Sequence, residues 1–290
     1  MNAGPRRPAV AGTFYPSDPR RLDELVAGLL AAAGAAPRPA GLSPGDVAGL
    51  MVPHAGLEYS GAIAALGWAL AGEIAPDTII LAGTDHQARA DGVGVWAGGP
   101  WQTPLGDVAV DIDLAGEIAA LGHPFARDDS AHSGEHSLEV QLPLILRACP
   151  GARIVPLAVS PLLATHREAG RVLGLLLARK RAAGERILLV ASSDMAHYPP
   201  ARVCEDVDAD LLEPLLRMDA DELQLREARV ARARRSGIVC GMCGIDPVRV
   251  ALSALAEMGS TRGILLRAAT SADAGGDPRR TVGYAAAAFR

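Results

Sequence analysis

Three histidines in this sequence follow short apolar runs of the kind that form buried strands. They are His54, His86 and His197, and the runs that precede them span 49–53, 78–83 and 187–191. The carboxyl ends of parallel strands meet at one edge of a sheet, where ligand sites lie. Because imidazole is the commonest metal ligand in proteins, this repeated placement predicts a common site.

Two imidazoles and one anionic ligand are the smallest facial set that holds a divalent transition metal and leaves positions open for other ligands. His54 and His86 are the imidazole candidates. The third ligand stays open among Asp85, Asp194, Glu139 and a cysteine. A carboxylate suits Fe(II) or Zn(II), whereas a thiolate favours Zn, Fe or Cu. Ligand type alone leaves the metal undecided.

The Asp194-x-x-His197 spacing offers a different chemistry. A histidine oriented by a carboxylate can act as a general acid or base near neutral pH. The neighbouring pair Ser192-Ser193 does not form the Gly-x-Ser-x-Gly turn of serine hydrolases. Asp194 is equally suited to capping a helix after the strand. We therefore expect proton transfer or capping, and not serine hydrolysis.

Cys240 and Cys243 form a C-x-x-C pair late in the chain. Redox dithiols of this spacing usually follow the first strand of a small βαβ unit, and a structural zinc site needs a second pair, which the sequence lacks. A thiol near a helix N-terminus has a lowered pKa and makes a good thiolate ligand. For Cys149 and Cys204 we expect simple packing or exposure.

Alternating strand and helix patterns predict one three-layer α/β domain with a mixed central sheet. A hairpin is expected over 92–111, and Ser60 is expected to cap a helix that ends near Gly72. Further strands are expected at 153–159, 187–191, 263–268 and 281–287, and helices from Pro19 to Gly34 and at 113–121, 165–180, 205–216 and 219–235, with another beginning near Pro247.

Composition narrows the class of protein. The 290 residues are 49% hydrophobic but only 3% aromatic, so the core is built mainly from aliphatic side chains. A net charge of −5, without a basic and aromatic stripe, argues against nucleic acid as a partner. The longest apolar run, 25–36, is too short to span a membrane, and no signal peptide is evident. We expect a cytoplasmic protein with no membrane partner.

The chain resembles the Memo family, labelled in bacteria and archaea as AmmeMemoRadiSam system protein B. The similarity runs nearly end to end, over residues 1–290 as a single Memo-like domain. It rests on these blocks, in order: 11–16 (AGTFYP), 53–56 (PHAG), 59–61 (YSG), Gly83-x-x-His86, 103–106 (TPLG), 135–143 (EHSLEVQLP), 192–197 (SSDMAH) and 282–284 (VGY).

The resemblance implies a fold similar to class III extradiol ring-cleaving dioxygenases, whose Fe(II) is held by two histidines and a glutamate. In the Memo pattern a cysteine of Cys-Gly-x-x-Pro takes the place of that glutamate. Cys243 keeps the proline at the right distance and Cys240 does not, so Cys243 is the implied ligand beside His54 and His86. His197, with Asp194, takes the acid/base position.

The sequence departs from the family pattern at Asp85, which the resemblance places beside the metal. Asp85, His136, Glu139 and Cys240 are expected to line the pocket. Fe(II) is the first choice of metal, with Cu or Zn as alternatives.

The implied function is a metal-dependent redox enzyme acting on an unknown small molecule. The first alternative is a non-enzymatic metal-handling or scaffold protein that works with other AmmeMemoRadiSam proteins. The second is a zinc-dependent hydrolase.

Overall fold

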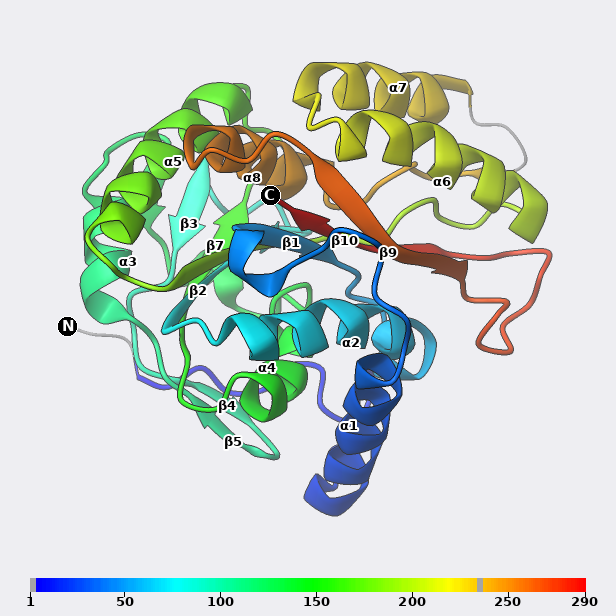
Figure 1. The fold of residues 1–290 in the computed structure, drawn as a ribbon, viewed down its shortest axis with the longest axis horizontal. Helices are drawn as coiled ribbons and strands as arrows, with labels where there is room; N and C mark the ends of the chain where they lie inside the picture. The colour runs from blue at the N-terminus through cyan, green and yellow to red at the C-terminus, as the bar shows by residue number, and fades with distance from the viewer. Residues whose placement is uncertain (1–3, 234–236) are drawn as a thin grey trace.

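The computed structural model describes residues 4–233 and 237–290 (Figure 1). The end of the helix predicted for 219–235 therefore lies outside the described residues. Within them, no helix has both the length and the apolar character needed to cross a bilayer.

A mixed sheet forms the centre of the protein, with strand order β6-β3-β7-β2-β8-β1-β10-β9 among the described residues. Its strands are β1 (Gly49–Val52), β2 (Thr78–Thr84), β3 (Val93–Val95), β6 (Phe125–Arg127), β7 (Arg153–Val159), β8 (Ile187–Ser192), β9 (Gly263–Thr270) and β10 (Gly283–Phe289). Strand β8 lies parallel to both β1 and β2, so these three strands end at the same edge.

Helices cover both faces of the sheet (Figure 1), as the three-layer prediction requires. One apolar cluster joins Leu22 and Trp68 to the sheet, and another joins Leu173 and Leu255 to its opposite face. On the first face lie α1 (Pro19–Gly34), α2 (Leu57–Ile74) and α4 (Leu142–Ala148); on the second lie α3 (Ile112–Ala119), α5 (His166–Ala182), α6 (Ala201–Leu216) and α8 (Ile245–Glu257), with α7 (Ala220–Ala233) packed on α6 and α8.

Helix α1 begins as its sequence predicts, because Asp18 accepts a hydrogen bond from the Arg21 N–H at 2.9 Å. Helix α2 differs from the prediction, since it begins at Leu57 with Gly56 as its N-cap. Ser60 lies inside its first turn and donates to the Ala55 carbonyl at 2.8 Å. The hydroxyl still ties down the turn after β1.

The predicted hairpin over 92–111 is wrong in its first half. Strand β3 pairs antiparallel with β7 and parallel with β6, which makes it part of the central sheet. The hairpin is confined to β4 (Trp101–Thr103) and β5 (Gly106–Val108). Alternation over three residues showed a strand but could not show its partner, because β7 lies some 60 residues further along the chain.

Candidate metal centre

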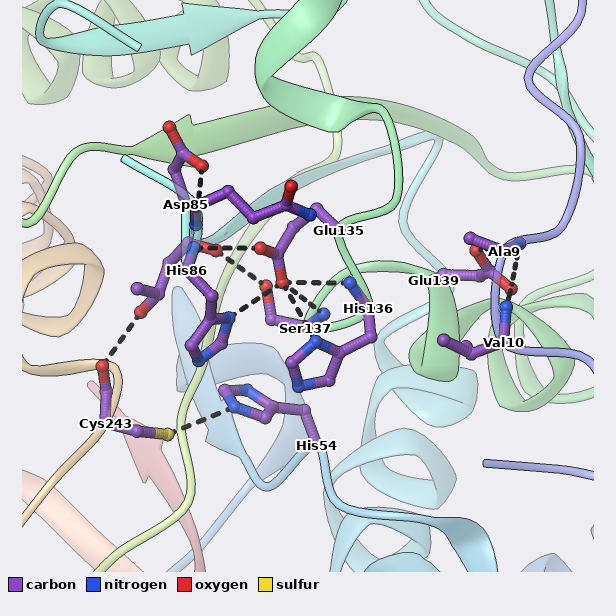
Figure 2. A network of polar contacts seen from close by, with 12 residues as sticks. Ala9, Val10, His54, Asp85, His86, Glu135, His136, Ser137, Glu139 and Cys243 are labelled. Carbon is purple, nitrogen blue, oxygen red and sulfur yellow. Dashed lines mark hydrogen bonds and ion pairs between the residues drawn. The ribbon is translucent and has the colours of Figure 1, made fainter. Parts of the chain in front are cut away.

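The turns after two strands and the turn before α8 bring His54, His86 and Cys243 together (Figure 2). His54 follows β1, His86 follows β2, and Cys243 precedes α8, which packs beside β8. One ligand atom from each of these residues lies within 4.8 Å of the other two. The sequence prediction that distant residues converge at the sheet edge therefore agrees with the geometry.

The hydrogen bonds around His54 determine which ring nitrogen carries the proton. The Ser192 hydroxyl donates to the Ser137 carbonyl at 2.7 Å, so its oxygen accepts from His54 Nδ1–H at 3.0 Å. Gln141 also donates to that oxygen at 3.1 Å. The His54 Nε2 lone pair therefore faces Cys243, whose Sγ lies 3.1 Å away.

His86 is oriented by a carboxylate that sequence reasoning did not select. Glu135 accepts from the His86 N–H and from Nδ1–H, both at 2.9 Å. This arrangement leaves His86 Nε2 available, and a carboxylate partner on the far nitrogen is the usual companion of a metal-bound histidine. Burial alone would raise the pKa of Glu135, but the hydrogen bonds from His86 and the Ser137 N–H, with the positive charge that His86 and His136 gain when protonated, outweigh it and lower that pKa to about 2.

The backbone around Cys243 is held between two strand ends. Thr84, the last residue of β2, donates to the Cys243 carbonyl at 3.1 Å, and the Gly244 N–H donates to Ser193 at 2.9 Å. A side chain at position 244 would come within 2.6 Å of the Ser192 carbonyl. Glycine is therefore required for α8 to approach this closely.

Burial keeps the side chains of this group in their neutral forms. Burial lowers the pKa of His54 well below its ordinary value, and the neighbouring His136 and His86 lower it further. Burial and the Asp194 carboxylate raise the pKa of the Cys243 thiol, contrary to the lowered value expected for its position near a helix start. A metal ion supplies the positive charge that such a site lacks, and it deprotonates a coordinating thiol.

Asp194 and His197 lie beside this group, as the spacing predicted, but they do not hydrogen bond to each other. Asp194 Oδ1 accepts from the backbone N–H groups of His54 at 2.6 Å and Ala55 at 3.2 Å. His197 Nδ1–H donates to the Met195 carbonyl at 2.8 Å, which leaves Nε2 free to accept a proton. Asp194, His197 and Cys243 also offer ligand atoms within 4.8 Å of one another.

A cavity of about 430 Å³ opens over these residues, a size suited to a small molecule. His136 lines it and stacks on His86, with ring centroids 4.6 Å apart. The Phe14 ring also packs against His136, with ring centroids 4.8 Å apart. Phe14 and Tyr59 also border a neighbouring groove of about 900 Å³.

Three residues expected in the pocket lie outside its lining. The Asp85 carboxylate is turned into its own loop, where it accepts from Gln87 N–H at 3.2 Å and Ala90 N–H at 2.6 Å (Figure 2). Glu139 points to the N-terminal segment, where it accepts hydrogen bonds from Arg6, Ala9, Val10 and Tyr15. Cys240 contributes its carbonyl, which accepts from the His197 N–H at 3.0 Å, but its thiol is not in the metal-ligating group.

The residues that sequence reasoning missed are Glu135, Ser192 and Gln141. Each lies within a motif block already noted, at positions 135–143 and 192–197. Gln141 connects Ser192 to two further residues, since it also donates to the Pro53 carbonyl at 2.8 Å and accepts from the Trp68 indole N–H at 2.8 Å. The motif blocks contain these three residues, but only the fold shows what they do. Glu135 and Ser192 orient histidines, and Gln141 holds Ser192.

The fold and the donor set together define a three-layer α/β protein with a two-histidine, one-cysteine group able to hold a metal ion at the carboxyl edge of its sheet. A family model described as Memo-like protein matches residues 6–288, and the chain belongs to that family.

Relatives of similar length share this assignment. The chain is 36% identical to a MEMO1 family protein of Ignicoccus hospitalis and 37% identical to one of Pyrobaculum arsenaticum, in each case over 98% of both chains. It is 34% identical to one of Aquifex aeolicus, over 96% of this chain and 97% of the relative. These matches cover the whole site.

One solved structure resembles the fold. It is the crystal structure of an uncharacterized protein from Escherichia coli K12, with a TM-score of 0.51 over 83% of this chain and 99% of that chain. At 14% sequence identity, the likeness concerns the fold alone.

Proposed function

We propose that the protein binds one divalent transition metal through His54, His86 and Cys243, with Fe(II) as the preferred ion and Cu or Zn as alternatives. The observation that carries the proposal is the preset hydrogen bonding, which turns the Nε2 atoms of both histidines toward a common centre with Cys243 Sγ. Two imidazoles and one thiolate suit these metals. Such an ion leaves coordination positions open and supplies Lewis-acid or redox chemistry there.

The enzymatic form of the proposal is a redox reaction on a small molecule bound in the cavity. His197 is placed to accept a proton there, because its Nδ1–H is committed to Met195 and its Nε2 is not. Asp194 holds the turn of His54 in place through two backbone N–H groups.

Metal analysis after anaerobic purification tests the binding. We expect about one equivalent of metal in the wild type and a loss of most of it in His54→Ala and Cys243→Ser, because each removes one of three ligands. Cys240→Ser is the matched control and should keep the metal, since its thiol lies outside the group. Full retention in both ligand variants contradicts the proposal.

Oxygen uptake with a panel of catechols separates an enzyme from a metal-handling protein. If the protein is an enzyme, the Fe(II)-loaded wild type should take up oxygen. The His197→Gln variant should keep its metal but take up oxygen much more slowly. A silent wild type with full metal content favours a metal-handling or scaffold role beside other AmmeMemoRadiSam proteins. One equivalent of zinc in the purified protein, together with hydrolysis of ester substrates, would favour the zinc-dependent hydrolase.

A further inference from the structure

Two adjacent arginines in the turn between β9 and β10 have different surroundings. Arg279 is bound to Asp277, with Nη2 to Oδ2 at 2.9 Å and Nε to Oδ1 at 3.1 Å. Arg280 has no carboxylate partner within residues 4–233 and 237–290. Its guanidinium carbon lies 4.1 Å from the centroid of the Tyr198 ring, and both residues line the metal-site cavity. An unpaired cation thus stands at the mouth of that cavity.

The backbone holds Tyr198 in position under this cation. Tyr198 has a φ of +73°, a left-handed conformation that residues other than glycine seldom adopt. Its N–H donates to the Thr281 carbonyl at 2.6 Å, and the Thr281 N–H donates to the Pro199 carbonyl at 2.8 Å. Strained conformations of this kind concentrate at ligand sites. The same turn that carries Arg280 therefore fixes the ring on which its guanidinium rests.

The guanidinium shares a neighbouring ring with His197, the proposed proton acceptor. The Tyr198 ring is 5.5 Å from the His197 ring, centroid to centroid, so Arg280 and His197 contact the same tyrosine. The acidic residues of the cavity are already engaged: Asp194 accepts from backbone N–H groups and Asp277 binds Arg279. The rest of the wall includes the aromatic rings of Phe14, Tyr59 and Tyr284.

From this arrangement we propose that the cavity takes a small aromatic carboxylate. Its carboxylate pairs with the Arg280 guanidinium, its ring lies among the aromatic side chains, and its other end faces His54, His86 and Cys243. Arginine binds carboxylates through two parallel N–H donors, which fixes orientation as well as charge. The proposal rests on the proposed metal function, because the metal-facing end of the ligand is defined by that site. Arg280 is then the residue that selects ligands by charge.

Binding of two probes that differ only in the carboxylate tests this assignment. The probes are 3,4-dihydroxybenzoate and catechol, titrated calorimetrically and without oxygen into the Fe(II)-loaded protein. We expect the wild type to bind 3,4-dihydroxybenzoate at least about tenfold more tightly than catechol, as one charge-assisted pair allows. Arg280→Gln should lose this preference, chiefly through weaker binding of 3,4-dihydroxybenzoate. Arg280→Lys should keep part of it, and added salt should weaken it because the guanidinium is solvent-accessible.

Arg202→Gln is the matched control, since it removes an exposed positive charge that lies outside the cavity lining, and it should keep the full preference. Equal affinities for the two probes in the wild type, undetectable binding of both, or an unchanged preference in Arg280→Gln overturns the proposal. Repeating the titrations on metal-free protein separates the two hypotheses. If no metal binds yet the preference persists and depends on Arg280, the metal proposal fails alone. If metal binds and the preference is missing, the carboxylate proposal fails alone.

Discussion

Glu135 and Glu139 lie four residues apart in one irregular segment before α4, yet they serve opposite sides of it (Figure 2). Glu135 faces the histidines and accepts from His86. Glu139 faces the N-terminal segment, where it pairs with Arg6 at 2.6 Å and also accepts from the Tyr15 hydroxyl at 2.7 Å. Both carboxylates are buried, but only Glu135 has a titratable imidazole as its partner.

The difference shows what separates a carboxylate of the site from a carboxylate of the fold. The Glu139 oxygens also accept from the N–H groups of Ala9 and Val10, so every partner is a permanent donor and no position is open to the cavity. Glu135 holds a ring whose second nitrogen is left free. Removal of Glu139 should therefore affect stability, and removal of Glu135 should affect metal affinity.

The largest effect, a loss of folding stability, is expected from Glu139→Gln. Loss of the charge leaves the buried Arg6 guanidinium without its counter-ion, which typically costs about 3–5 kcal/mol. Urea denaturation measures the loss. Glu73→Gln is the control, because Glu73 pairs with Arg38 at the surface, where such pairs contribute about 0–1 kcal/mol. Equal destabilisation by the two variants contradicts the structural role of Glu139, as does selective metal loss in the folded Glu139→Gln protein.

The Glu139 side also accounts for a pH dependence of stability. His132, whose carbonyl accepts from Arg6 Nε at 2.9 Å, is fully buried, and burial lowers its pKa to about 4. An unfolded histidine titrates near 6.5, so below that pH the unfolded state takes up a proton that the folded state refuses. Stability is therefore lost as the pH falls from about 6.5 to 4, by up to about 3 kcal/mol from this residue.

Unfolding of the metal-free protein in urea at pH 7, 5.5 and 4.5 checks this expectation. His132→Gln keeps a donor for the Gly94 carbonyl but cannot titrate, so its stability should fall less steeply than that of the wild type. Other buried groups such as His54 contribute to both slopes, and the difference between the two proteins isolates His132. Parallel slopes would show that His132 does not carry the effect. His123→Gln, at an exposed position, should leave the slope unchanged.

The same contrast explains how far the sequence alone could lead. The apolar runs predicted the strands before His54, His86 and His197, because burial on both faces leaves a continuous apolar signal. The segment that contains Glu135 and Glu139 forms a loop and a short 3-10 turn before α4, and its sequence does not show which carboxylate faces the cavity. The sequence alone made Glu139 a candidate for the pocket, and the partner that decides its role, Arg6, lies 133 residues away.

Glu135→Gln is expected to weaken metal binding, which is an effect of intermediate size. The variant keeps an acceptor for His86 Nδ1–H but loses the charge that strengthens this bond, and changes of this kind weaken metal affinity about 10–100-fold. Competition with a chelator of known affinity measures the change in the anaerobic protein. The folded Glu139→Gln protein is the comparison and should bind metal within about threefold of the wild type. If Glu139→Gln loses more metal affinity than Glu135→Gln, then Glu139 and not Glu135 is the carboxylate that acts on the metal site.

The smallest effect on metal affinity is expected from Asp85→Asn, although Asp85 is the carboxylate nearest in sequence to a proposed ligand. Its oxygens are bound to backbone N–H groups of its own loop, and an asparagine keeps one of the two acceptors. We expect a loss of about 1–2 kcal/mol in stability from the unpaired Ala90 N–H, with metal affinity within about threefold of the wild type. The same chelator competition tests this, and a loss of tenfold or more would place Asp85 with Glu135 as a carboxylate that acts on the metal. Asp85 adjoins His86 in sequence, whereas Glu135 lies 49 residues away but is hydrogen bonded to it. The comparison therefore shows whether a carboxylate affects metal affinity because it is a neighbour of a ligand in the chain or because it is hydrogen bonded to that ligand.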